Sequence, residues 1–306
     1  MEKIVLWGAG YWGKRAFEEY GTERVICFID NYHKDAQIEN KEIISFDTYR
    51  ARNYSYRIII CVWDFQDIVK ELWKAGIEKF SLYHGIYISG TVPRSEEIAH
   101  TKWIYKLKEL ADFSGKEVLE IGSRVVTGAN NRRIFEKAVY TGFDIYPGEN
   151  VDVVGDAHRL SSYFEKGKKF DLIFCSAVFE HLMMPWLVAD EMIRLLKPEG
   201  YIFVETHYSY ASHERPWHFF QFSEQALKVL FSENRGIKCI EAGVSNPYIG
   251  IFSEEADEYL QGKLIGDLYC HSEFLGQKVE EVKDLSWNNN FGLKNMGMYP
   301  VKKEKE

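Results

Sequence analysis

Short apolar runs alternate with amphipathic segments over the first 90 residues of the chain. The apolar runs end at glycines or polar residues, and the segments between them carry apolar side chains at helical spacing. One run, RIIICVW, is apolar at nearly every position, as in a parallel strand buried on both faces. This alternation predicts a small doubly wound α/β sheet. Its strands are expected at KIVLW, RVICFID, RIIICVW and KFSLY, with helices at KRAFEEY and at residues 65–73.

The pattern changes after residue 90, where a proline and a serine open the charged segment SEEIAHTKWIYKLKELADF. A helical stripe is expected in this segment, formed by Ile98, Lys102, Tyr105 and Leu110. We therefore predict a domain boundary near residue 92 and a connecting helix within residues 93–115.

Apolar runs resume at residue 116 and again alternate with helical segments. The expected strands are EVLEIG, AVYTGFDIY, VDVV, FDLIFCSA and YIFVETH, and the clearest helix is WLVADEMIRLL, before a KPEG turn. Beyond SEQALKVLF the pattern weakens, and two further strands are expected at GIKCIEAGV and GMYPVKK, with a polar, aromatic-rich insertion between them. The sequence therefore predicts an α/β fold with two Rossmann-like domains, a small one at residues 1–92 and a larger one at residues 116–306.

The composition limits the classes of protein to which the chain can belong. Of its 306 residues, 46% are hydrophobic and 27% are charged, which is enough to bury the cores of two domains. The net charge of −8 argues against a nucleic-acid partner, which needs a basic surface. No apolar run approaches the ~20 residues of a membrane span, the start does not resemble a secretory signal, and the cysteines form no CxxC pair. We expect a soluble, reduced, cytoplasmic protein, and the oligomeric state stays open.

A glycine cluster, GAGYWG, directly follows the first expected strand. Gly8, Gly10 and Gly13 have the G-x-G-x-x-G spacing, and Asp30 ends the next strand. In this context backbone amides at a helix N-terminus bind a phosphate, and the carboxylate holds a ribose hydroxyl. We predict a nucleotide site here, although Trp12 would crowd a pyrophosphate and about 90 residues supply only half of a dinucleotide fold. A glycine turn that only packs, or that presents a surface to a partner, stays open.

Acidic and small residues also follow the successive strands of the larger domain. VLEIGSRVVTGAN ends the first strand, TGFDIYPG the second, VDVVGDAHRLS the third and FDLIFCSAVFEHL the fourth. The residues concerned are Glu120, Gly122, Asp144, Asp156, Ala157 and Ser176. A carboxylate can accept two vicinal hydroxyls, and a glycine lets the chain approach a ligand closely. A sheet of this kind without a cofactor is the alternative interpretation.

This order of motifs resembles the class I S-adenosylmethionine-dependent methyltransferases over residues 116–235. VDVVGDAH, FEHL and LLKPEG resemble the branch that accompanies bacterial surface-glycan and secondary-metabolite synthesis. The resemblance implies S-adenosylmethionine as cofactor, with Glu120 and Gly122 at its methionine end, Asp144 at its ribose, and Asp156 and Ala157 at its adenine. GSRVVTG spreads the glycines that the family usually keeps close together, so Ser123 is expected to help hold the amino-acid end.

Four histidines follow the fourth and fifth strands of this domain, at the sheet edge where open α/β folds bind ligands: His181, His207, His213 and His218. A histidine suits proton transfer near neutral pH, and we predict His181 as the catalytic base because FEHL closely follows Ser176. His213 and His218 are the next candidates. Imidazoles beside Glu180 and Glu205 would also permit magnesium, manganese or zinc, but the spacing matches no metal motif, so no metal is predicted.

These features together favour an enzyme that methylates a hydroxyl of a small acceptor. The first domain resembles a small nucleotide-sugar-binding domain, through GAG, FIDN and its third apolar strand, so a glycan-related or nucleotide-linked acceptor is expected. One alternative is an NAD(P)-dependent oxidoreductase that uses the first glycine cluster, although a catalytic Tyr-x-x-x-Lys pattern is absent. A non-catalytic nucleotide-binding protein is the other.

Overall fold

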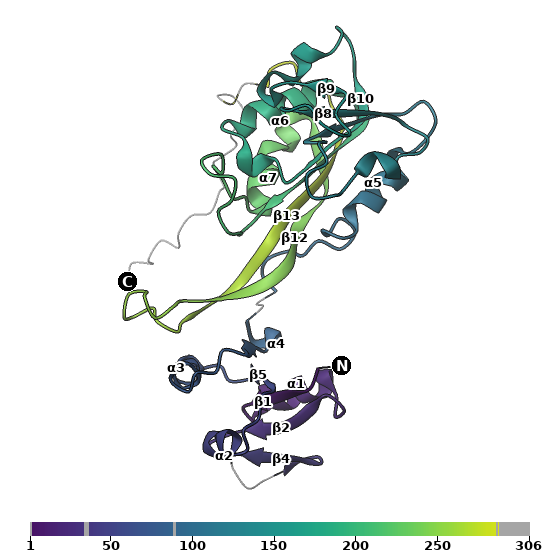
Figure 1. Ribbon diagram of the computed structural model, residues 1–306. Helices are drawn as coiled ribbons and strands as arrows, with labels where there is room; N and C mark the ends of the chain where they lie inside the picture. The colour runs from purple at the N-terminus through teal and green to yellow at the C-terminus, as the bar shows by residue number, and fades with distance from the viewer. Residues whose placement is uncertain (1, 34–36, 88–89, 286, 288–306) are drawn as a thin grey trace, which may run out of the picture. The chain divides into compact units, whose positions relative to one another are not determined.

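The computed structural model describes residues 2–33, 37–87, 90–285 and 287. These residues divide into two compact units (Figure 1). The first unit contains the described residues up to Val92 together with residues 247–268, and the second contains residues 93–246 and those described from Tyr269 onward. Each unit is built on a sheet of mostly parallel strands with helices, which confirms the predicted α/β class.

The first unit has the sheet order β3-β4-β2-β1-β5-β6 within the described residues. All neighbouring pairs are parallel except β3 with β4. The central strand β1 is buried on both faces, because Val5 packs into one apolar cluster and Ile4 into the other. The strands are β1 (Ile4–Trp7), β2 (Val25–Ile29), β3 (Gln37–Ile38), β4 (Lys41–Ile44), β5 (Arg57–Ile60) and β6 (Phe80–Leu82), of which β3 and β4 were not predicted. The helices are α1 (Tyr11–Tyr20), α2 (Phe46–Ala51), α3 (Gln66–Lys74) and α4 (His84–Tyr87).

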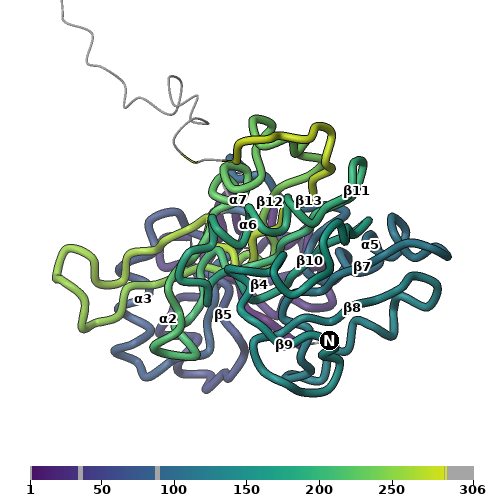
Figure 2. Tube along the Cα trace, turned by 90° about the horizontal axis from the view of Figure 1, so that it is seen from above, coloured from purple at the N-terminus to yellow at the C-terminus, as the bar shows by residue number. Residues whose placement is uncertain are grey.

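The second unit has the order β12-β13-β11-β10-β7-β8-β9, and Figure 2 shows β10, β7, β8 and β9 following one another. The strands β7 to β11 run parallel, so their carboxyl ends meet at one edge, which we call the carboxyl edge. Strand β13 joins β11 in the antiparallel sense. The bounds are β7 (Glu117–Ile121), β8 (Val139–Asp144), β9 (Val153–Val154), β10 (Phe170–Ser176), β11 (Leu196–His207), β12 (Ile237–Ile251) and β13 (Leu264–Lys278).

Helices cover both faces of this sheet (Figure 1). Successive residues of β10 face opposite ways: Phe174 packs with Trp103 of α5, whereas Cys175 belongs to the cluster that contains Val188 of α6. The helices are α5 (Trp103–Ala111), α6 (Pro185–Leu195) and α7 (Glu224–Leu230), with the short turns η1 (Asn131–Ile134), η2 (Ala157–Tyr163), η3 (Phe179–His181) and η4 (Glu233–Arg235).

Three expectations about the second half of the chain differ from the structure. The buried face of α5 is formed by Trp103, Leu107 and Ala111, while Tyr105 is 61% exposed, so the predicted stripe is wrong. Residues 93–115 lie in the second unit, because that face packs against its sheet. Strand β13 runs through the region expected to be an insertion, and GMYPVKK lies outside the described residues.

Within the part of the chain that the structure describes, no helix is both long enough and apolar enough to cross a bilayer. The thiols of Cys27, Cys61 and Cys175, which lie within or next to apolar strands, are buried.

Candidate functional site

The carboxyl edge of the second unit brings together the residues predicted to hold the cofactor. Glu120 lies near the end of β7, Asp144 ends β8, Asp156 follows β9 and Ser176 ends β10. Because these four strands are parallel neighbours in the sheet, the side chains occupy the same edge.

Glu120 is buried and is held by side chains from three segments. Its Oε1 accepts a hydrogen bond from Asn131 Nδ2 at 2.6 Å, and its Oε2 accepts from the hydroxyl of Tyr140 and, at 3.3 Å, from Asn150 Nδ2. Burial raises the pKa of Glu120 to about 7, against the lowering effect of the two asparagines. Glu120 therefore connects the loop after β7 to the loop after β8. No sequence motif pointed to Asn131 or Asn150.

The turn after β7 depends on Gly122. Its φ of +81° lies in the left-handed region, and a Cβ atom built there would approach Val178 Cγ2 closer than 3.0 Å. The next side chain, Ser123, is 3% exposed and donates its hydroxyl to the carbonyl of Asn150 at 3.1 Å. Ser123 therefore supports the turn, and the hydrogen of its hydroxyl is bonded to Asn150.

Asp144 is nearly buried and is bonded to the chain around it. Its Oδ2 accepts from the backbone N–H of Arg124 at 3.3 Å, and its Oδ1 accepts from the N–H of Tyr146 at 2.9 Å. The Nε of Arg124 lies 3.7 Å from Oδ1, and the guanidinium stands 5.5 Å from the centre of the Tyr146 ring. A ribose at this carboxylate would therefore lie beside Arg124, which the sequence did not identify.

Asp156 caps η2 and stays open to solvent. Its Oδ1 accepts from the backbone N–H of His158 at 3.0 Å and lies 2.7 Å from His158 Nδ1. Because His158 Nε2 accepts from the N–H of Met184, Nδ1 carries the hydrogen and donates to Asp156. Burial opposes ionisation, but the bonds from His158 lower the pKa of Asp156. With the side chain 41% exposed, this ionised carboxylate is an available acceptor next to the buried Ala157.

The four predicted histidines form one cluster. His181 comes from η3, His207 ends β11, and His213 and His218 lie in the loop before α7. The ring of His213 lies 4.9 Å from that of His181, 5.0 Å from that of His207 and 4.7 Å from that of His218, between ring centres. The backbone fixes this loop, since the N–H of Phe219 donates to the carbonyl of Glu180 at 2.8 Å.

Hydrogen bonds define which ring nitrogens of this cluster carry hydrogen. His181 Nδ1 lies 2.9 Å from the carbonyl of Trp217, and His213 Nδ1 lies 3.0 Å from the carbonyl of Ala211. A carbonyl only accepts, so Nδ1 is the donor in both rings and Nε2 keeps its lone pair in the neutral imidazole. His218 is opposite, because its Nδ1 accepts from the N–H of His213 at 3.2 Å; burial lowers its pKa. His181 and His213 therefore each present a basic nitrogen.

A second group of titratable residues lies between β11 and β13. Glu205 and Glu273 are cross-strand partners and both are buried. Glu205 accepts from Ser176 Oγ at 2.7 Å and lies 2.8 Å from Nδ1 of His100, whose pKa this contact raises. Glu273 accepts from the hydroxyls of Ser95 and Ser245, and burial raises its pKa to about 7. Ser176 is thus bonded to this group.

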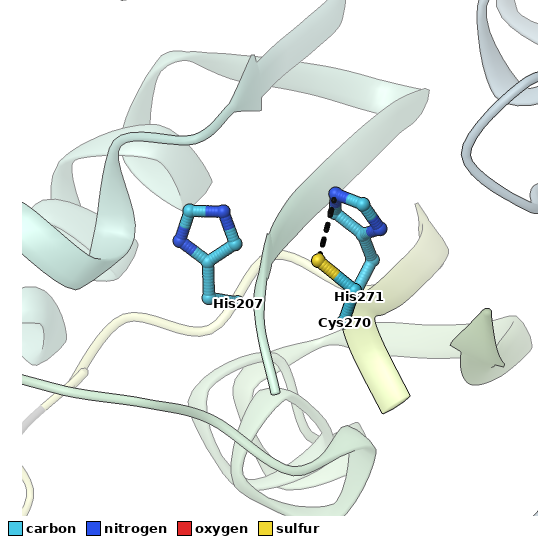
Figure 3. A group of neighbouring side chains, drawn as sticks. All are labelled: His207, Cys270 and His271. Carbon is cyan, nitrogen blue, oxygen red and sulfur yellow. Dashed lines mark hydrogen bonds between the residues drawn. The ribbon is translucent and has the colours of Figure 1, made fainter. Parts of the chain in front are cut away.

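His271 joins the two groups. Its ring stacks on that of His100 at 4.0 Å and lies 5.8 Å from that of His207. Figure 3 shows His207 and His271 with the thiol of Cys270, which lies 3.7 Å from His271 Nε2. Burial lowers the pKa of His271 to about 4, so this imidazole is neutral at pH 7. The sequence did not identify His100, His271 or Glu273, because they are distant from the βα motifs along the chain.

The glycine cluster of the first unit forms a tight strand–turn–helix. A Cβ atom at Gly13 would overlap the carbonyl of Gly8, whereas nothing lies within 4 Å of one built at Gly10. Asp30 Oδ2 accepts from the N–H of Ala9 at 3.0 Å, and Oδ1 accepts from the N–H groups of Tyr32 and His33. The carboxylate predicted to hold a ribose therefore joins the loops after β1 and β2.

Comparison with known families finds a match within the second unit. Residues 95–242 match the family model described as a methyltransferase domain. The match begins before the predicted start at residue 116. It includes α5, the predicted cofactor residues and the four predicted histidines, and it ends before His271 and Glu273. It supports the prediction of a methyltransferase with S-adenosylmethionine as cofactor.

Several solved structures are similar in part. An S-adenosylmethionine-dependent methyltransferase from Archaeoglobus fulgidus is 17% identical, with 57% of this chain and 91% of that chain covered and a TM-score of 0.42. One from Aquifex aeolicus is 17% identical, with 57% and 88% covered and a TM-score of 0.37. The N-methyltransferase NodS from Bradyrhizobium japonicum, solved with S-adenosylhomocysteine, is 17% identical, with 58% and 86% covered and a TM-score of 0.38. No curated protein matches the sequence.

Proposed function

We propose that the second unit transfers the methyl group of S-adenosylmethionine to a hydroxyl of a small, glycan-related or nucleotide-linked acceptor. The observation that supports this most strongly is the pair His181 and His213. In the neutral imidazole each has its lone pair on Nε2, because Nδ1 donates to a backbone carbonyl. A hydroxyl must lose its proton as it is methylated, and an imidazole lone pair can accept it.

The donor groups at the carboxyl edge fit the cofactor. Asp156 offers an ionised, exposed carboxylate to the adenine amino group, and Asp144 offers carboxylate oxygens to the ribose hydroxyls. Gly122 leaves the turn after β7 without a Cβ where the methionine end is expected. When bound, S-adenosylmethionine supplies an electrophilic methyl group, and the protein mainly has to hold the acceptor in line with it.

His181 is the proposed base because its segment lies against the expected methionine end. Val178, three residues earlier in the chain, borders the position that a Cβ of Gly122 would occupy. The acceptor proton passes to His181 Nε2, and Glu180 Oε1, at 4.0 Å, stabilises the imidazolium that forms. The hydrogen bond from His181 Nδ1 to Trp217 keeps the ring in the required tautomer.

Aromatic side chains near the histidines support a sugar as acceptor. Tyr210 stacks on His207 with ring centres 4.6 Å apart, and Trp217 is 58% exposed beside the carbonyl that fixes His181. A flat ring of this kind binds the apolar face of a sugar. His213 and His218 would then contact the acceptor hydroxyls.

For the first unit, considered by itself, we propose a nucleotide-binding site at the Gly8–Gly13 turn. Three exposed aromatic residues follow its parallel strands: Tyr11 after β1, Tyr32 after β2 and Trp63 after β5. Exposed aromatic rings at the carboxyl ends of the first unit's parallel strands are suited to stack on a nucleobase. Titration with uridine diphosphate and with NADH tests the site, and binding of NADH alone would favour the oxidoreductase alternative.

The proposed reaction is tested with S-adenosylmethionine that carries a labelled methyl group. The full chain is incubated with nucleotide sugars, phosphorylated sugars and small phenols, and the label is followed into the acceptor. Transfer that needs Asp144 and His181 is the expected result. Label on an amine or thiol acceptor in place of a hydroxyl would contradict the proposal.

A further inference from the structure

A buried carboxylate oxygen at the carboxyl edge makes no hydrogen bond. Glu180 is fully buried; its Oε2 accepts from the hydroxyl of Thr206 at 2.7 Å, but Oε1 has no hydrogen-bond partner among the described residues. His207 Nδ1 lies 3.0 Å from Oε1, within ion-pair distance but without good hydrogen-bond geometry. A buried ionised oxygen normally has a well-aligned donor or a bound cation, because burying it without one is costly.

Two imidazoles lie close to the Glu180 carboxylate. The ligand atoms of Glu180, His181 and His213 all lie within 4.8 Å of one another, and His181 Nε2 is 4.0 Å from Glu180 Oε1. Both histidines donate Nδ1–H to a backbone carbonyl, of Trp217 and of Ala211. Metal-binding histidines are typically held in this way, with one ring nitrogen bonded to the protein and the other free.

We infer that Glu180, His181 and His213 form a binding site for a divalent transition-metal ion such as Zn²⁺. Two ligand atoms bound about 2.1 Å from one zinc ion lie about 3.0–3.4 Å apart, so the three groups need to approach by roughly 1 Å, a small side-chain rotation. Three protein ligands leave a coordination position open, as in catalytic zinc sites. One carboxylate and two imidazoles are ligands that zinc accepts.

Two neighbouring groups also bring possible metal ligands close together, but their polar atoms are already bonded within the protein. In the group of His100, Glu205 and His271, Glu205 already accepts from Ser176 and contacts His100 at 2.8 Å. In the group of His207, Cys270 and His271, the thiol contacts His271 Nε2 (Figure 3). The Glu180 group is the one that holds a buried carboxylate oxygen without a hydrogen bond.

The cation would occupy the lone pairs that the proposed function assigns to proton transfer, so with the cation bound His181 is a ligand and no longer the base. This chemical role rests on the proposed methyl transfer. A hydroxyl bound in the open position would release its proton to water, since coordination lowers its pKa. The oxygen then forms its bond to the methyl carbon as the bond from that carbon to sulfur breaks. Binding of the cation itself does not depend on this reaction.

The test uses the full chain after removal of metal by a chelator. Calorimetric titration with ZnCl₂ should give one site per chain with a Kd of about micromolar or tighter. Glu180→Gln and His213→Gln should each raise the Kd at least about ten-fold, whereas the matched control His100→Gln keeps the parental value. No saturable binding, or a greater loss in His100→Gln than in His213→Gln, would overturn the assignment.

A second measurement does not depend on any variant remaining folded. Co²⁺ bound to the parent chain should show the intense visible absorption of a low-coordinate site with nitrogen ligands, and Zn²⁺ should displace it. The weak spectrum of hydrated Co²⁺ would overturn the site. Methyl transfer is then compared in metal-free and Zn²⁺-loaded protein: absence of transfer in both contradicts the proposed function, while Zn²⁺ binding still decides the metal site.

Discussion

Gly122→Ala offers a sharp test of the carboxyl edge, because the structure predicts two separate penalties for one added methyl group. The backbone at φ +81° disfavours an L-residue by about 1–2 kcal/mol. The new Cβ would also meet Val178 Cγ2 at less than 3.0 Å, and overpacking of this kind costs about 1–3 kcal/mol. We therefore expect a loss of roughly 2–5 kcal/mol in the free energy of unfolding, together with weaker binding of S-adenosylhomocysteine.

A double-mutant cycle with Val178→Ala separates the two penalties. Removing the valine side chain relieves the steric part and leaves the backbone part, so the double variant should be at least about 1 kcal/mol more stable than the sum of the single changes predicts. Unfolding in denaturant and calorimetric titration with S-adenosylhomocysteine supply the two readouts. Additive effects, or a loss below about 1 kcal/mol in Gly122→Ala, would refute the contact between the Gly122 turn and the segment that carries His181.

Three further outcomes follow from the site. Asp144→Ala should weaken S-adenosylhomocysteine binding ten-fold or more, about 1.5–3 kcal/mol, whereas Asp171→Ala, at the opposite end of β10, should leave it unchanged in calorimetry. Burial raises the pKa of Glu120 from 4.5 to about 7, so its contribution to stability is lost as the pH rises through that window. The free energy of unfolding of Glu120→Gln, measured in denaturant relative to that of the parent, should therefore rise by about 2–4 kcal/mol between pH 4 and pH 8. A difference that does not change with pH would contradict this. His218→Ala should raise the KM for the acceptor and leave cofactor affinity unchanged, and a fall in kcat alone would assign it to proton transfer.

The βα pattern predicted the strands of both sheets that are buried on both faces. It also predicted that acidic residues would lie at the ends of β7 and β8 and after β9, because a polar residue at the end of an apolar run marks a strand end. Strand β13 was missed, since its pairing with β11 joins residues about 70 positions apart and leaves no local signal. For the same reason the contribution of Glu273 and His271 could not be predicted.

The hydrogen bonds of Ser123 and Asp30 could not be predicted from the sequence. Ser123 Oγ donates to the carbonyl of Asn150, and Asp30 Oδ2 accepts from the amide of Ala9 in the glycine loop. A sequence does not show whether a polar side chain is already satisfied by the chain around it. Likewise, residues 247–268 were assigned to the larger domain, although Ile249 and Ile251 pack with the core of the first unit.

The central claim, that imidazoles at the carboxyl edge activate a hydroxyl for methylation, is tested most directly by single-turnover methyl transfer with His181→Ala. The rate of transfer from labelled S-adenosylmethionine to the best acceptor should fall by about 10²–10⁴, while the Kd of S-adenosylhomocysteine stays within about two-fold of the parent. Parental transfer rates in His181→Ala and also in His213→Ala would contradict the claim, because neither Nε2 atom could then be responsible for removing the proton.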